Sequence, residues 1–160
     1  MSRVSFNFGP NAKLTGDGER FLKELNKLQS LEVAIGFQSG SDSYDDGTDV
    51  CDVAIYNEFG TSTIPPRPFM KQSFESNADN INKHVQNSYK QLEAGSTAEA
   101  ITQSVGTMAK GVIQDYIANG EFVPNAPSTI ARKHSSRPLI DTGLMRQSVN
   151  FVVRGAGTTE

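Results

Sequence analysis

Five aspartates gather within residues 42–52 and are the first candidates for a chemical site: Asp42, Asp45, Asp46, Asp49 and Asp52. Asp42, Asp46 and Gly47 fit positions 1, 5 and 6 of a calcium-binding EF-hand loop. Position 3 is Tyr44, however, and position 12 is Val53, where calcium binding requires a bidentate Glu. The pattern therefore predicts a solvated acidic loop, and we expect no metal and no other cofactor.

Residue types that catalyse reactions are present, but they lack the spacing that catalysis requires. The two histidines, His84 and His134, have no Cys or His at metal-ligand spacing, which disfavours a zinc site. No G-x-S-x-G nucleophile elbow and no phosphate-binding P-loop occur. The single cysteine, Cys51, stands beside Asp52, whose carboxylate disfavours the reactive thiolate. The sequence predicts a protein that is not an enzyme, and a small hydrolase is an alternative from another class.

A segment rich in aromatic residues and proline is better suited to contacts than to catalysis. Residues 56–61 (YNEFGT) lead into residues 64–70 (IPPRPFM). Stiff backbone loses little entropy on docking, and aromatic residues and Arg are favoured at interfaces. The segment predicts a contact surface. The alternative is a stiff connector with Phe59 and Phe69 in the core.

Hydrophobic periodicity predicts the elements that position these segments. Alternating apolar residues predict strands at 2–8, 31–37 and 149–153. Helical spacing predicts a helix capped by Asp17, a short helix capped by Asp49, and two long helices over 70–92 and 98–116. Gly95, followed by a capping box of Ser96 and Glu99, separates the long helices. Ser128 is expected to cap one short turn after residues 122–127, and Gly143–Gln147 is expected to form another turn of helix.

The expected fold class is α+β. A small antiparallel or mixed sheet of about three to four strands packs against an αα-hairpin of the two long helices, with extended interaction loops. The chain of 160 residues suits a single domain over 1–154, followed by a flexible C-terminal tail at 155–160.

Composition excludes several classes of protein. One cysteine cannot form a disulfide scaffold, and apolar runs of about five residues fall far short of the ~18 that span a membrane. A net charge of −3 and a pI near 5.4 disfavour a sequence-independent DNA clamp. The net charge conceals an acidic loop at 42–52 and a basic cluster at 132–146, which we expect to meet across a boundary between subunits.

Two sequence blocks resemble a known family. Residues 57–61 (NEFGT) and 64–69 (IPPRPF) are similar to the "EFG…PPRPF" signature of small tailed-bacteriophage morphogenesis proteins. Residues 128–133 (STIARK) and 137–148 (RPLIDTGLMRQS) resemble the second signature of that family, "TI..K…PLIDTG.LR.S". The resemblance covers roughly residues 50–154. The family often has a Trp before its second signature, whereas this chain has Phe122-Val123-Pro124 there and no Trp.

The resemblance implies a structural virion protein, made in the host bacterial cytoplasm, for neck assembly or tail completion. It implies a ring of six or twelve copies at the head–tail junction, which joins the portal side of the capsid to the tail and leaves a DNA channel. The implied partners are the chain itself and portal-side adaptor or tail-tube and terminator proteins. Genomic DNA passes without specific binding, and no membrane is involved. The alternatives are a tail terminator capping the tail tube and, in a different class, a small nucleic-acid-binding module.

The residues expected at the assembly interface lie in the two signature blocks: Tyr56, Asn57, Glu58, Phe59, Gly60, Pro65, Pro66, Arg67, Pro68, Phe69, Thr129, Arg132, Lys133, Arg137, Pro138, Leu139, Asp141, Thr142, Gly143 and Arg146. For Asp141, the alternative is that it only caps a helix. The five aspartates of the acidic loop are candidate channel-lining residues, because like charges repel DNA phosphates within a Debye length of ~8 Å. The alternative is an exposed outer loop.

Overall fold

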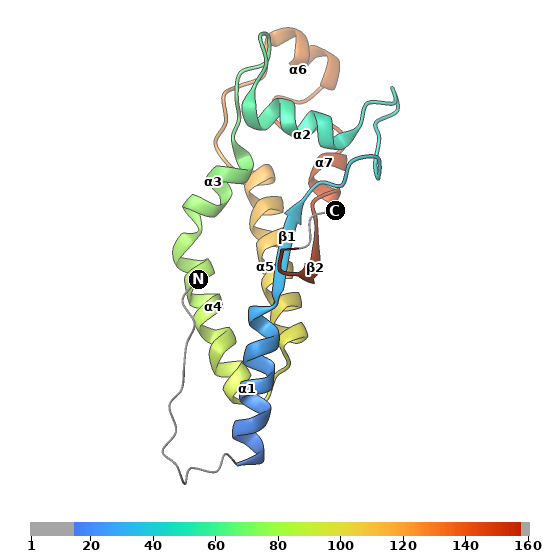
Figure 1. The fold of residues 1–160 in the computed structure, drawn as a ribbon. Helices are drawn as coiled ribbons and strands as arrows, with labels where there is room; N and C mark the ends of the chain where they lie inside the picture. The colour runs from blue at the N-terminus through green and yellow to red at the C-terminus, as the bar shows by residue number, and fades with distance from the viewer. Residues whose placement is uncertain (1–14, 158–160) are drawn as a thin grey trace.

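The computed structural model describes residues 15–157, which form an elongated α+β fold (Figure 1). The elements in chain order are α1 (Gly16–Gln29), β1 (Leu31–Gly36), α2 (Val50–Phe59), α3 (Phe69–Ser76), α4 (Ala78–Glu93), α5 (Ala98–Asn119), α6 (Pro127–Lys133), α7 (Leu144–Gln147) and β2 (Asn150–Gly155). The long helix α5 contacts α1, α3, α4, α7 and both strands. Helices α2, α6 and α7 gather at one end of the molecule, and α1 lies toward the other (Figure 1).

The sheet consists of β1 and β2, which pair antiparallel with Leu31 opposite Gly155 and Gly36 opposite Asn150. The strands predicted at 31–37 and 149–153 are therefore confirmed, within a residue or two at their ends. The expectation of about three to four strands is not confirmed, since residues 15–157 contain two. The strand predicted at 2–8 lies outside the described residues. Pairing reaches into the predicted tail, since the Ala156 amide donates to the Ser30 carbonyl at 2.8 Å.

The long helix predicted over 70–92 is interrupted, so the expected αα-hairpin of two long helices is not confirmed. Helix α3 ends at Ser76 and α4 begins at Ala78, because Asn77 leaves the helical conformation at φ −115° and ψ 13°. The Asn77 side-chain amide donates to the Ser73 carbonyl at 2.9 Å. Short polar side chains compete in this way with the helical backbone. The apolar spacing continues across Asn77, so the pattern alone gives no sign of the break.

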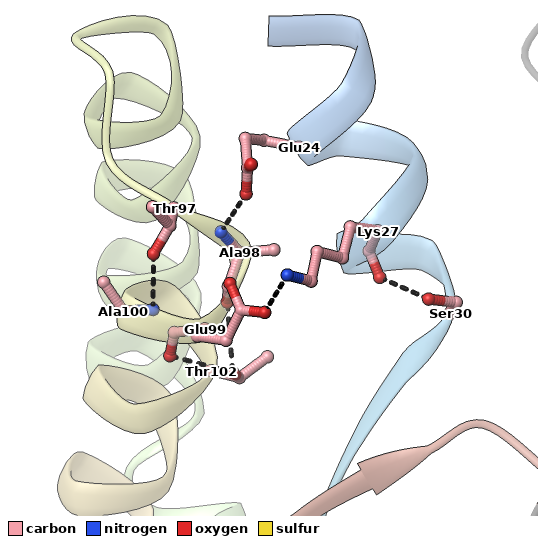
Figure 2. A network of polar contacts seen from close by, with 8 residues as sticks. All are labelled: Glu24, Lys27, Ser30, Thr97, Ala98, Glu99, Ala100 and Thr102. Carbon is pink, nitrogen blue, oxygen red and sulfur yellow. Dashed lines mark hydrogen bonds and ion pairs between the residues drawn. The ribbon is translucent and has the colours of Figure 1, made fainter. Parts of the chain in front are cut away.

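The start of α5 is held by α1 as well as by its own cap. The predicted capping box of Ser96 and Glu99 is wrong: Thr97 is the N-cap, and its hydroxyl accepts the Ala100 amide at 3.2 Å. The Glu24 carboxylate of α1 accepts the Ala98 amide at 2.8 Å, and Lys27 forms an ion pair with Glu99 (Figure 2). These contacts fix α1 against the first turn of α5.

Buried side chains line α5 at both ends of the molecule. One cluster lies near α2 and α7 and consists of Val50, Ala54, Phe69, Ile113, Ile117, Met145 and Val149. Toward α1, the side chains of Leu92, Ala98 and Ile101 are buried. Between these regions Gly106 permits close approach of the sheet, since a Cβ there would lie 2.2 Å from Cδ2 of Phe151. In the described part of the chain, no helix combines the length and apolar character needed to cross a membrane.

Candidate functional site

Helices α2, α6 and α7 lie together at one end of the molecule (Figure 1). Residues of this end line a groove of about 590 Å³. Its walls come from the acidic loop, from the segment that follows α2, and from residues 125–142. These are the three regions in which the sequence places contacts, although they are far apart along the chain. The structure brings them together within one molecule.

Arg67 lines this groove, but its side chain is only 6% exposed. Its guanidinium donates to the carbonyl oxygens of Val123 at 2.8 Å and Pro124 at 3.3 Å. It also donates to the side-chain oxygens of Asn57 and Asn125, both at 3.3 Å. Burial lowers the pKa of Arg67 from its ordinary value. Arg67 therefore fastens the loop after α5 to the segment after α2.

Glu58 and Gly60 also shape the first signature block through contacts within the chain. The Glu58 carboxylate accepts the amides of Met70 at 2.8 Å and Lys71 at 3.1 Å. It thereby caps α3, whose own N-cap residue makes no side-chain bond. Gly60 has φ +75°, and a Cβ there would lie 2.9 Å from the Ile64 carbonyl oxygen. Only glycine fits this turn, because other residues combine strain with a backbone clash.

The aromatic residues of the first block divide between core and surface. Phe69 is fully buried, whereas Phe59 is 77% exposed. The connector interpretation is therefore right for Phe69 and wrong for Phe59. Ile55 and Tyr56 of α2 are also exposed, so this helix presents an apolar surface to solvent. Among the remaining predicted contact residues of this block, Pro65 and Pro66 are exposed and Pro68 is half-buried.

Helix α6 supplies the basic wall of the groove. It begins with Pro127 in its first turn and has Ala126 as N-cap, so the predicted Ser128 cap is wrong. Arg132 is exposed and Lys133 half-buried, with the Lys133 ammonium donating to the Arg137 carbonyl at 3.3 Å. Burial lowers the pKa of Lys133, while the charge of Asp141 opposes this shift.

Residues 137–146 close the groove from the side of α7. Gly143 is the N-cap of α7, and the Thr142 hydroxyl accepts the Leu144 amide at 3.3 Å, so the helix-capping role considered for Asp141 is wrong. Asp141 is exposed and lines the groove. Gly143 has φ +84° at the N-cap of α7. The other predicted contact residues of this block divide by position: Thr129 and Leu139 line the groove, Pro138 is half-buried, and Arg137 and Arg146 are exposed.

The acidic loop is an ordered turn in which Asp49 has a structural role. Asp49 caps α2, as predicted, by accepting the Cys51 amide at 2.8 Å. Its second oxygen accepts the Gly40 amide at 2.7 Å and the Ser39 hydroxyl at 3.2 Å. These bonds, led by those from Cys51 and Gly40, lower the pKa of Asp49.

Only two of the five aspartates, Asp45 and Asp46, line the groove. Hydrogen bonds from Thr48 lower the pKa of Asp46, and the charge of Arg132 adds to this effect. Acidic and basic residues therefore face each other across the groove of a single chain, whereas they were expected to meet across a boundary between subunits. Asp42 is half-buried, and Asp52 is exposed on α2.

Cys51 and His84 are of residue types that can catalyse reactions, and both lie outside the groove. Burial, followed by the charges of Asp49 and Asp52, raises the pKa of the Cys51 thiol. The sequence identified the carboxylate effect but not the larger effect of burial. His84 shares a hydrogen bond of 3.1 Å with Ser104 and so links α4 to α5. Within residues 15–157, no three His, Cys, Asp or Glu side chains are grouped so as to hold a metal ion.

Comparison with protein-family models, curated proteins and solved structures finds no match to this chain. Its function is therefore inferred from the groove, the exposed face of α2 and the charges around them. The groove has an apolar floor that includes Val53 and Met145, an acidic wall and a basic wall. Such an arrangement can bind a protein segment that carries both charged and apolar side chains.

Proposed function

We propose that this chain is a structural, non-enzymatic virion protein of a tailed bacteriophage that forms a ring at the head–tail junction. The ring joins the portal side of the capsid to the tail and leaves a channel for DNA. One observation carries the proposal: three segments distant in sequence line one groove. They converge on one end of an elongated fold (Figure 1). The sequence resemblance to morphogenesis proteins supports the same role.

The groove is built for docking because its walls are already fixed in the free chain. Arg67 holds the loop at residues 123–125, and Glu58 holds the start of α3. Preformed walls lose little conformational entropy when a partner binds. The exposed aromatic surface of α2 supplies apolar area, and the opposed charges of Asp46 and Arg132 supply orientation.

Passage of DNA fits the charge of the chain. The net charge is −3, and Asp45, Asp46 and Asp52 are exposed. If these carboxylates face the lumen of the ring, they repel phosphates within a Debye length of ~8 Å, and DNA slides without specific binding. A ring structure with this loop on its outer rim would exclude this part of the proposal.

The test is the mass of the purified chain, alone and mixed with the portal-side and tail-tube proteins of the genome that encodes it. Native mass spectrometry is expected to show a closed ring of six or twelve copies and a complex with at least one partner. Binding to the tail tube alone would favour the tail-terminator role over the neck role. A monomer that binds neither partner would contradict both.

A charge reversal then tests whether the groove is the binding surface. Arg132→Glu is expected to weaken partner binding at least tenfold, because it places a carboxylate opposite Asp46. Lys23→Glu is the control: Lys23 is exposed on α1 and does not line the groove. Equal loss of binding in both variants would indicate a general effect of charge and exclude the groove as the specific site.

A further inference from the structure

Within residues 15–157, the sheet of β1 and β2 has an unpaired edge along β1. The Ser30 carbonyl accepts the Ala156 amide, so these two residues form a hydrogen-bonded pair. Such pairs alternate along an antiparallel ladder, and the register places every second residue of β1 in the same class: Glu32, Ala34 and Gly36. The other residues of β1 direct their amides and carbonyls away from β2: Leu31, Val33 and Ile35. No backbone group of the described chain bonds to them on that side.

The edge of β1 also lacks the features that usually protect an exposed strand. Natural sheets protect their edges with Pro, Lys, a bulge or a covering segment. Strand β1 (LEVAIG) contains no Pro and no Lys, and its register with β2 is continuous. Its one charged residue, Glu32, forms an ion pair with Arg154 of β2 at 2.8 Å. An edge of this kind can accept a further strand through its backbone groups.

A small apolar hollow borders this edge, on the face of the sheet that packs against α5. It has a volume of about 160 Å³, and among the described residues that line it Val33 alone comes from the sheet. The hollow therefore lies on the side of β1 that faces away from β2. Its other apolar lining residues come from α1, α4 and α5: Leu28, Val85, Tyr89, Ile101 and Val105. Because a strand directs every second side chain to one face, a strand added to β1 would point side chains toward this hollow.

Residues 2–8 (SRVSFNF), which lie outside the described part of the chain, have the pattern that such a strand requires. Val4, Phe6 and Phe8 alternate with polar residues, and Val and Phe favour strands. The segment matches β1 in length to within a residue. In an antiparallel register that places Phe8 opposite Leu31, Phe6 lies opposite Val33, at the hollow. All three apolar side chains then share the face of the sheet that packs against α5.

The length of chain before α1 favours a segment that comes from a neighbouring copy. Helix α1 has 14 residues and is about 21 Å long, and β1 continues from its far end in the same direction (Figure 1). To lie along β1 of its own chain, the segment would have to return past the whole of α1 with residues 9–14 as its link. From Phe8 to Thr15, such a link spans at most about 25 Å when fully extended. Helix α1, with Thr15 and Ser30 at its ends, already requires nearly all of this length, whereas the segment of another copy has no such constraint.

We propose that residues 2–8 of one copy add to β1 of the next copy as a third, antiparallel strand, with Phe6 in the hollow. The proposal rests on the ring-forming function above and identifies a contact that joins neighbouring copies. The segment and the edge are different surfaces of the same chain, so the contact is heterologous and makes a ring when the rotation between copies closes. Backbone hydrogen bonds supply affinity, and the alternation of side chains fixes the register.

A pair of lysine variants tests the inserted side chain. Phe6→Lys removes the aromatic ring and is expected to weaken self-association by about tenfold or more in sedimentation velocity. Ser5→Lys is the matched control, because it introduces the same residue one position earlier, on the side of the segment that faces away from the hollow. It is expected to assemble as the unmodified chain does. Equal assembly of the two variants, whether weakened or intact, would overturn the contact.

Hydrogen exchange, measured residue by residue, tests the pairing of the edge itself. In the assembled chain the Val33 amide is expected to be protected, and in Phe6→Lys it should exchange faster by about tenfold or more. The Ala34 amide points toward β2 and should keep its protection in both chains. Exchange at Val33 that is the same in both chains would contradict the added strand.

Disulfide trapping distinguishes a neighbouring copy from the same chain. In the proposed register Ser5 lies opposite Ala34, so one copy carries Ser5→Cys and the other Ala34→Cys, both with the free Cys51 replaced by Ser. Mild oxidation of the mixture is expected to link one copy of each. A chain that carries both new cysteines should likewise give linked oligomers. If this chain forms only the bond within itself, the segment pairs with its own β1 and the proposed contact is wrong.

Failure of this contact is distinguishable from failure of the proposed function. Rings that persist in Phe6→Lys overturn the contact but leave the head–tail role standing. An unmodified chain that remains monomeric at every concentration also overturns the contact, and its binding to portal-side or tail-tube proteins then decides the proposed function separately.

Discussion

The guanidinium of Arg67 lies 2.8 Å from the carbonyl oxygen of Val123, although 56 residues separate them in sequence. The same side chain reaches Pro124 and Asn125. One buried cation thus holds an edge of the groove to the segment after α2. Because a loop cannot keep such a shape alone, the geometry of the groove depends on this side chain.

Arg67→Lys is expected to loosen that edge and to lower the free energy of unfolding by about 1–3 kcal/mol. A lysine ammonium cannot reproduce the planar fork of donors, so buried carbonyls lose their partners. Urea denaturation measures the loss, and hydrogen exchange should become faster at residues 123–126. Arg132→Lys, an exposed change on the same groove, is expected to stay within about 0.5 kcal/mol. Equal midpoints for both variants would contradict the structural role.

Arg67 also shows where prediction of the site from sequence reaches its limit. The sequence indicated three segments as candidates for contacts, because Pro, aromatic residues and Arg are visible as types, and the structure brings these segments together around one groove. Whether their contacts lie within the chain or with a partner depends on the tertiary fold. Arg67, Glu58 and Phe69 make theirs inside the molecule, whereas Phe59 is left exposed.

Gly106 provides a test of the packing between α5 and the sheet. A Cβ there would lie 2.2 Å from Cδ2 of Phe151, so Gly106→Ala must displace the ring or the strand. We expect a loss of about 1–3 kcal/mol in unfolding free energy, as for other overpacked sites. Gly111 is exposed on the same helix with nothing within 4 Å of its Cβ. Gly111→Ala should therefore stabilise by about 0.5–1 kcal/mol.

The decisive measurement is whether the two alanine variants change the free energy of unfolding in opposite directions, because both replace a glycine in α5. Thermal and urea unfolding are expected to place Gly106→Ala below the unmodified chain and Gly111→Ala above it. If both variants are stabilised, the close approach of α5 to β2 is wrong.

Only part of the fold could be predicted from the sequence. Periodicity located β1, β2, α2 and α5, because apolar spacing follows directly from burial on one face. It did not reveal the break at Asn77, since the break arises from a side-chain bond to Ser73 that leaves the apolar spacing unchanged. It also placed the cap of α5 one residue early, because Ser96 and Thr97 are both good caps and tertiary contacts decide between them.

Glu58→Ala is expected to fray the first turn of α3. The carboxylate accepts two amides there, from Met70 and Lys71, and no cap within the helix replaces it. The expected loss is about 1 kcal/mol, typical of a removed N-cap. Glu58→Gln keeps an acceptor oxygen but not the charge, so it should lose less. Hydrogen exchange at residues 70 and 71 distinguishes local fraying from a global effect, and unchanged exchange there would contradict the capping role.

The lowered pKa of Asp49 predicts how the free energy of unfolding changes in acid. Its pKa is lowered in the folded chain by the amides of Cys51 and Gly40. A carboxyl with a lowered folded pKa stabilises fully above its unfolded pKa of about 3.9, and this contribution is lost as the pH falls through the folded value. Asp49→Asn still accepts the Cys51 amide but has no charge to titrate.

The Asp49→Asn chain should therefore be somewhat less stable at pH 7, because an amide group cannot accept from Gly40 and Cys51 at the same time as well as a carboxylate does. Below pH 4 its stability should fall less steeply with pH than that of the unmodified chain, since unfolding no longer takes up this proton. Urea midpoints measured from pH 7 down to pH 2 test both statements. Two parallel curves over the acidic range would show that Asp49 does not link the folding of α2 to protonation.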